Sequence, residues 1–158
     1  MRLTMVVPDT PAALNEALEG LVRLNAKLLL AAFRVGRPVP PLYSLGVRYK
    51  REPGRREWWQ TIADNIDAQI ADCEDLASHL AAEHRIDGFL KAFGSSSRVR
   101  ALPSRMQTEL AVSGYFYPAR AVCIRTGKRT YHAVTRHPGG RIEDPSRALG
   151  MAVPGRRL

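Results

Sequence analysis

Cys73 lies at a position in the sequence where a cysteine could act as a nucleophile. Cys73 lies in the segment Asp72-Cys73-Glu74-Asp75, just before a helical apolar pattern, so the sequence predicts that it opens a helix. A thiol there meets the positive end of the helix dipole and backbone N–H groups without helical partners. Both favour the thiolate, which is the reactive form. The neighbouring acids act in the opposite direction, so a nearby imidazolium would have to supply much of the activation.

Two later residues could complete a relay with this thiol. His132 lies in a strand pattern, and Asp144 closes the next short strand, twelve residues further on. The turn Pro138-Gly139-Gly140 lies roughly midway between them, so an antiparallel hairpin would place the two side chains together. A carboxylate would then orient the imidazole, and the imidazole would pair with the thiolate.

The other candidates for chemistry have simpler interpretations. Cys123 lies mid-strand and is expected to be a buried, inert thiol, although one disulfide with Cys73 stays open. His79 and His84 share the predicted helix of Cys73, but at spacings that favour no closed tetrahedral metal site. His137 precedes a proline in a turn and is expected to be solvated. Without a glycine-rich phosphate loop either, the sequence predicts no metal and no cofactor.

The elements that must position these residues come in the order helices, then strands. An apolar stripe predicts a helix from about Pro11 to Phe33, and two shorter helices are expected over about 57–68 and from residue 72 or 73 to about Arg85, where Asp87-Gly88 should end the latter. Strands are expected over 120–125, 129–135 and 141–143, with a further short strand within 45–50. Residues 89–113 show no clear pattern. This order predicts an α+β fold with an antiparallel meander.

Composition limits the class of protein. The 158 residues are 45% hydrophobic and 25% charged, as in one globular domain. No apolar run approaches the roughly 20 residues of a membrane span, and no signal peptide precedes the domain, so we expect a cytoplasmic protein. The net charge of +9 falls entirely in residues 80–158. Either a polyanionic partner or a solvated basic face would account for it, while no nucleic-acid-binding motif is present.

The order of the three motifs resembles a known family. The segments 72–77, 131–134 and 142–146 are similar to the transglutaminase-like branch of the papain-like cysteine peptidase superfamily, in particular to small members encoded by tailed phages and prophages. The resemblance covers about residues 45–151. It leaves an N-terminal helix and proline-rich connector (1–44) and a basic tail (152–158) outside.

The resemblance implies a papain-like, transglutaminase-like core in which the nucleophile opens a helix packed on a small antiparallel sheet. Cys73 would be the nucleophile, His132 the general base and acid, and Asp144 the orienting group. An upstream Trp or Gln would support the oxyanion site, for which the candidates are Trp58, Trp59, Gln60 and Gln69.

The expected activity is that of a cysteine hydrolase acting on amide or isopeptide bonds of a protein or peptide, such as a cell-wall peptide. Water as acceptor would make it a protease or amidase, and an amine would make it a transglutaminase. The alternative is a structural or assembly component of a phage head or tail that keeps the fold with or without activity. It would be virion-associated and would contact other phage proteins, or a second copy through the N-terminal helix.

Overall fold

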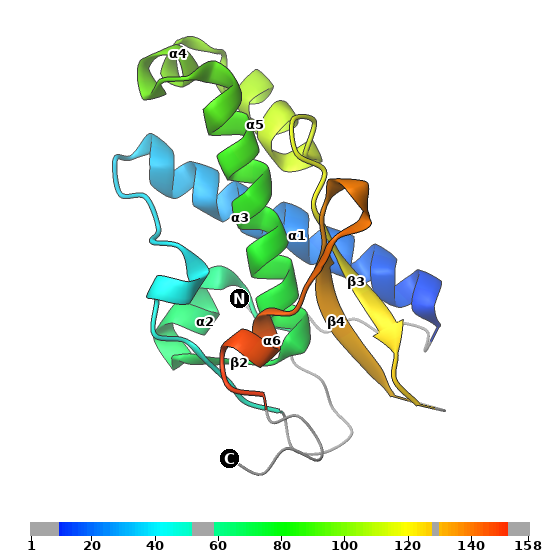
Figure 1. The fold of residues 1–158 in the computed structure, drawn as a ribbon. Coiled ribbons are helices and arrows are strands. Elements are labelled where there is room, and N and C mark those ends of the chain that lie inside the picture. Colours follow the sequence, from blue (N-terminus) through cyan, green and yellow to red (C-terminus); the bar gives the residue numbers. More distant parts are fainter. Residues whose placement is uncertain (1–9, 52–58, 128–129, 152–158) are drawn as a thin grey trace.

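The computed structural model describes residues 10–51, 59–127 and 130–151. A long helix, α3 (Cys73–Phe93), runs through the centre of the molecule (Figure 1). Asp72 caps it by accepting the N–H of Asp75, and the Asp75 carboxylate accepts the N–H of Asp72 in return. This reciprocal capping box satisfies donors that the first helical turn leaves free, which explains why the helix begins at Cys73.

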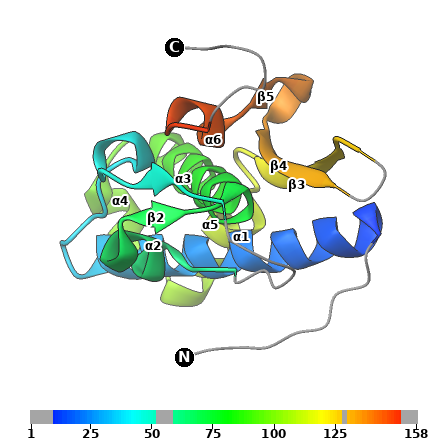
Figure 2. The same ribbon diagram turned by 90° about the horizontal axis from the view of Figure 1, so that it is seen from below.

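The other elements are grouped around α3. Before it come α1 (Pro11–Arg34), the 3-10 helix η1 (Leu42–Ser44), β1 (Arg48–Tyr49), α2 (Ile62–Ala68) and β2 (Ile70–Ala71). After it come α4 (Ser96–Ala101), α5 (Ser104–Ser113), β3 (Arg120–Arg125), β4 (Tyr131–Arg136), the 3-10 turn η2 (Pro138–Gly140), β5 (Ile142–Glu143) and α6 (Pro145–Ala148). Figure 2 shows α1 on one side of α3 and the β5–α6 segment on the other.

The C-terminal strands form the predicted antiparallel meander in the order β3-β4-β5. Strands β3 and β4 pair along their whole length, whereas β5 pairs with β4 only at Thr135↔Glu143 and Arg136↔Ile142. The first part of β4, residues 131–134, therefore has one edge that no strand of the meander covers. Strands β1 and β2 form a separate parallel pair. The α+β class is confirmed.

Two apolar clusters make up the core. The larger joins α1, α3, α5, β3 and β4, and the smaller lies between α3 and the η1–β1–β2 region. Helix α1 supplies Leu18, Val22, Ala26 and Leu30 to the larger cluster. The apolar stripe of the N-terminal helix is thus buried against its own chain. Among the described residues, no helix combines the length and the apolar character needed to cross a membrane.

The predicted end of the third helix is wrong. The helix continues through Gly88 and ends only at Gly94, which has a φ of 69°. Gly88 is needed for a close contact, because a Cβ atom on it would lie 2.4 Å from the Cβ of Tyr117. A glycine that makes room for a neighbour gives the same sequence signal as one that ends a helix.

The second helix also begins later than predicted. It starts at Ile62, because Thr61 and Asp64 form a capping box there, and the expected start at Glu57 lies outside the described residues. The patternless stretch 89–113 holds the end of α3 and the short helices α4 and α5. The proposed turn at Pro53-Gly54 and the basic tail 152–158 also lie outside the described residues.

Candidate functional site

The structure places His132 and Asp144 in direct contact. The Nε2 atom of His132 lies 2.9 Å from Oδ2 of Asp144, and their side chains are only 12% and 16% exposed. Asp144 follows β5 and caps α6 by accepting the N–H of Arg147, whose side-chain Nε also lies 3.0 Å from Oδ2. The acid is therefore held from two sides while it holds the imidazole. Because Nε2 is used in this contact, Nδ1 is the ring nitrogen left for another partner.

The thiol of Cys73 lies at the free edge of β4, at the backbone N–H of Ala133, the residue that follows His132. The N–H of Cys123 donates to Oδ1 of Asn15 at 2.7 Å, so in the pair Cys123↔Ala133 the backbone groups point away from the β3–β4 interface. The N–H of Ala133 accordingly points to the edge that β5 leaves open, where it donates to the Cys73 sulfur. Helix start and strand edge thus bring the thiol beside the residue that follows His132.

The electrostatic surroundings of the thiol oppose its ionisation. Burial raises the pKa of Cys73 strongly, the Glu74 carboxylate and Asp72 raise it further, and the Ala133 N–H offsets only part of this. The thiol donates to Oε2 of Glu74 at 3.0 Å. The sequence-based expectation that the helix N-terminus favours the thiolate is therefore overridden here, because burial and the adjacent acid outweigh the dipole.

A cluster of acids lies under this thiol. Asp72, Glu74 and Asp75 are all buried, with at most 8% of each residue exposed. Burial, together with Asp75 and Glu74, raises the pKa of Asp72 to about 10, so this carboxyl keeps its proton at neutral pH. Burial and the nearby Cys73 and Asp72 also raise the pKa of Tyr49 on β1. The resting site thus holds a neutral thiol, a neutral carboxyl and a neutral phenol.

The four oxyanion-support candidates have different surroundings. Trp58 lies outside the described residues. Trp59 packs against the larger core cluster, and the exposed Gln69 donates its side-chain amide to the carbonyl of Ile66 at the end of α2. The backbone N–H of Gln60 donates to Oδ1 of Asp75 at 2.6 Å, which ties Gln60 to the start of α3. Gln60 is thus a described candidate that a hydrogen bond joins to α3.

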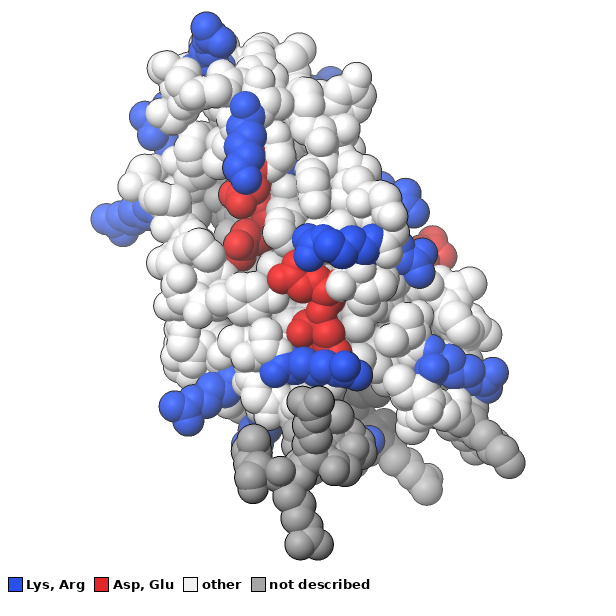
Figure 3. Space-filling view, viewed as in Figure 1, with Lys and Arg blue, Asp and Glu red and all other residues white. Residues whose placement is uncertain are grey.

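The surface around Asp144 carries both charge signs. Glu83 interacts electrostatically with Asp87 and Glu143, and Tyr43 with Glu83, Glu143 and Asp144. On the face in Figure 3 the acidic side chains form a central band flanked by basic ones. The positive charge of residues 80–158 is therefore not a uniformly basic surface here.

The structure also assembles residues that the sequence analysis did not group. His137, expected to be solvated, is only 3% exposed, because Tyr117 and Glu143 both hydrogen-bond its ring. His84 on α3 lies with its ring centroid 4.6 Å from that of His137. His84 and His137 are 53 positions apart in the chain, so no local motif could have joined them. Cys73 and Cys123 are both free thiols, which closes the question of a disulfide between them.

Comparison with family models, with curated proteins and with solved structures finds no match for this chain.

Proposed function

We propose that this chain is a transglutaminase-like cysteine hydrolase that acts on amide or isopeptide bonds of a protein or peptide. The contact that carries the proposal is the one between His132 Nε2 and Asp144 Oδ2, at 2.9 Å. The residue after His132 on β4, Ala133, donates its N–H to the Cys73 sulfur. A held imidazole beside a thiol at a helix start is the arrangement that nucleophilic catalysis by cysteine uses.

In the proposed reaction the thiol proton moves to Nδ1 of His132, and the sulfur attacks the substrate carbonyl carbon. The C–N bond then breaks, the amine leaves with the proton from His132, and a thioester remains on Cys73. Water or a second amine next attacks the thioester, gives its proton to His132, and releases an acid or a new amide with the thiol restored. Asp144 stabilises the imidazolium in both halves.

The hydrogen bond to Glu74 makes a specific demand on this mechanism. In the resting protein the S–H group points to the Glu74 carboxylate. The proton must therefore turn from Glu74 toward His132 before attack, and a substrate that displaces the Glu74 side chain would allow this. Because Glu74 also raises the pKa of the thiol, removing its charge should increase the thiolate fraction.

The test is alkylation of the folded protein by iodoacetamide in a Cys123→Ala background, followed by peptide mapping. Labelling should occur at Cys73, disappear in Cys73→Ala and become several-fold faster in Glu74→Gln. In contrast, Glu109→Gln removes a carboxylate from α5 and should leave the rate unchanged. If neither the parent nor Glu74→Gln is labelled while folded, Cys73 is not a nucleophile and the enzymatic proposal is wrong.

A second candidate function is supported by the buried, neutral thiol. A chain that keeps the fold without turnover would serve as an assembly component, for example of a phage head or tail. Mass spectrometry of purified particles from a host carrying this sequence tests this. We expect the chain in stoichiometric amounts if it is a particle component, and detection only in the lysate would contradict that role.

A further inference from the structure

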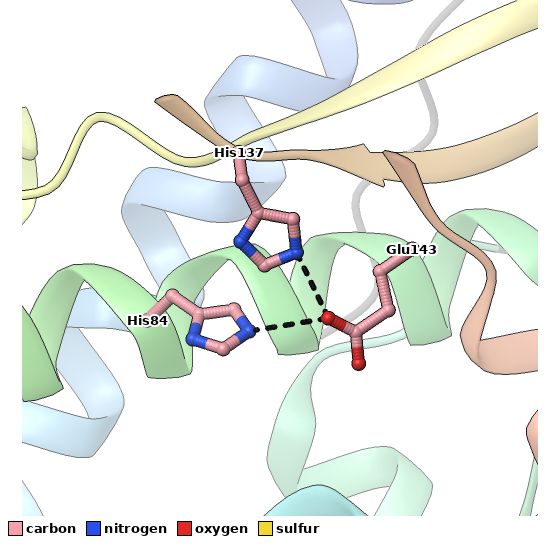
Figure 4. Close-up of side chains that lie close together, drawn as sticks. All are labelled: His84, His137 and Glu143. Carbon is pink, nitrogen blue, oxygen red and sulfur yellow. Dashed lines mark hydrogen bonds and ion pairs between the residues drawn. The ribbon is translucent and has the colours of Figure 1, made fainter. Parts of the chain in front are cut away.

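We propose that His84, His137 and Glu143 form a binding site for a divalent transition-metal ion of the zinc type, separate from the thiol site. Their ligand atoms all lie within 4.8 Å of one another, and Figure 4 shows both imidazoles directed at the same carboxylate oxygen. Cys73 and His84 are eleven residues apart on α3, or about 16 Å along the helix axis. The inference therefore does not depend on the activity proposed for Cys73.

The polar contacts within the cluster cannot all be satisfied as hydrogen bonds at the same time. Nη2 of Arg141 lies 2.9 Å from Nε2 of His137 and can only donate, which requires a lone pair on that nitrogen. Yet Oε2 of Glu143 lies 2.8 Å from the same Nε2, which requires a proton there. One nitrogen cannot satisfy both contacts. A metal ion between the nitrogen and the carboxylate would bind both lone pairs.

The third ligand is enclosed and without a hydrogen bond. Nε2 of His84 is inaccessible to solvent, has no hydrogen-bond partner, and lies 3.8 Å from Oε2 of Glu143. A buried ring nitrogen without a partner is costly unless it serves another purpose. Ligands about 2.0–2.1 Å from a tetrahedral zinc ion lie roughly 3.3 Å apart. The 2.8 and 3.8 Å separations bracket that value.

Further partners hold the other two ligands, His137 and Glu143, in place, as is usual at metal sites. The hydroxyl of Tyr117 lies 3.0 Å from Nδ1 of His137, so this ring can donate Nδ1–H and keep Nε2 free for the ion. The hydroxyl of Tyr43 donates to Oε1 of Glu143 at 2.7 Å, leaving Oε2 for the ion. Two imidazoles and one carboxylate suit zinc and its neighbours rather than Mg²⁺ or Ca²⁺, which prefer all-oxygen sites. They also leave a fourth position for water.

Arg141 is the group that an ion would replace. Its side chain is 62% exposed, and it reaches Glu143 with Nη1 at 3.3 Å as well as His137 with Nη2. The guanidinium can move into solvent by giving up only these two contacts, and the ion would then take its place at His137 and Glu143. We therefore expect that removing its charge leaves metal binding as tight as in the parent or makes it tighter.

Isothermal titration of the EDTA-treated full chain with Zn²⁺ tests the proposal. One ion should bind per chain, excess Mg²⁺ should not compete, and Zn²⁺ should raise the melting temperature. His84→Gln and Glu143→Gln should each weaken binding at least about tenfold. Asp87→Asn removes the same charge from an exposed acid near the cluster and should leave the affinity unchanged. Arg141→Gln should bind as tightly as the parent or more tightly.

Three outcomes would overturn the site. The first is no stoichiometric Zn²⁺ binding by either the parent chain or Arg141→Gln. The second is equal weakening by Glu143→Gln and Asp87→Asn, which would indicate diffuse attraction to the acidic band. The third is loss of binding in Cys73→Ala, which would place the ion at the thiol. If His84→Gln proves unfolded, the comparison of Glu143→Gln with Asp87→Asn still decides.

Discussion

Asp72 caps α3, a role that favours its ionised form, but its burial favours the protonated form. Its oxygen caps the helix by accepting the N–H of Asp75, which a carboxylate would do best. Burial among Glu74 and Asp75 nevertheless raises its pKa to about 10 and keeps it protonated at neutral pH. The protein therefore holds one extra proton that the unfolded chain would release.

This proton makes stability fall with rising pH. The unfolded Asp72 loses it near pH 4, whereas the folded one keeps it up to about pH 10. Its contribution to the free energy of unfolding is thus complete below about pH 4 and is lost as the pH rises toward 10, by up to about 1.4 kcal/mol per pH unit. Asp72→Asn keeps the cap but cannot ionise, so its free energy of unfolding should decline less between pH 5 and 8.

Urea denaturation at both pH values measures this difference. Asp67→Asn removes an exposed acid from α2 and should leave the pH dependence of the parent unchanged. Parallel curves for Asp72→Asn and the parent would show that Asp72 is ionised in the folded protein.

At the scale of elements, two helical glycines predict opposite responses to the same substitution. A Cβ atom on Gly20 of α1 would meet nothing within 4 Å, whereas one on Gly88 of α3 would lie 2.4 Å from Tyr117. Alanine is the better helix former by about 1 kcal/mol, so Gly20→Ala should stabilise by about that amount. Gly88→Ala should instead destabilise by about 1–3 kcal/mol, because Tyr117 must move.

Thermal unfolding of the two variants measures the contrast. Both substitutions add one methyl group to a helix interior, so each serves as the control for the other. Stabilisation by Gly88→Ala would mean that Tyr117 yields freely and that the glycine has no packing role.

The same glycine shows what the sequence can and cannot predict about elements. The β3–β4 hairpin could be predicted because alternation and turn residues are local signals, and α1 could be predicted because its cap and apolar stripe are local as well. In contrast, the reason for a glycine inside α3 is Tyr117, which lies 29 positions after Gly88 in the sequence. Helices α4 and α5 were missed because six to ten residues hold too few turns for a clear stripe.

The candidate sites divide in the same way. The contact between His132 and Asp144 follows from the turn between them and could be predicted. The neutral state of Cys73 could not, because it depends first on how deeply the folded chain buries the thiol and then on the Glu74 and Asp72 carboxyl groups beside it. The cluster of His84, His137 and Glu143 requires α3 to lie beside the end of β4, which no spacing in the sequence indicates.

Over the whole molecule, Arg85 joins the elements that surround α3. It is 2% exposed, and its guanidinium contacts both carboxylate oxygens of Glu19 on α1, at 2.9 and 2.7 Å. It also donates to the carbonyls of Val112 on α5 and Ala119 before β3. Burial alone would raise the pKa of Glu19, but hydrogen bonds from Arg85 and Arg23 outweigh it and lower that pKa. One side chain thus links three neighbours of the central helix.

Replacing the Arg85 guanidinium by a lysine ammonium tests how much its hydrogen bonds contribute to the stability of the fold. A lysine cannot reach Glu19 and two carbonyls in different directions, so Arg85→Lys should leave buried acceptors unpaired and cost about 2–4 kcal/mol of unfolding free energy. Arg23 is the other partner of Glu19, and its side chain is 60% exposed. Arg23→Lys should therefore cost less than about 1 kcal/mol of unfolding free energy. Urea denaturation of both variants compares a buried arginine, Arg85, with an exposed one, Arg23, both of which pair with Glu19. Equal losses would show that apolar packing alone holds α1 and α5 against α3.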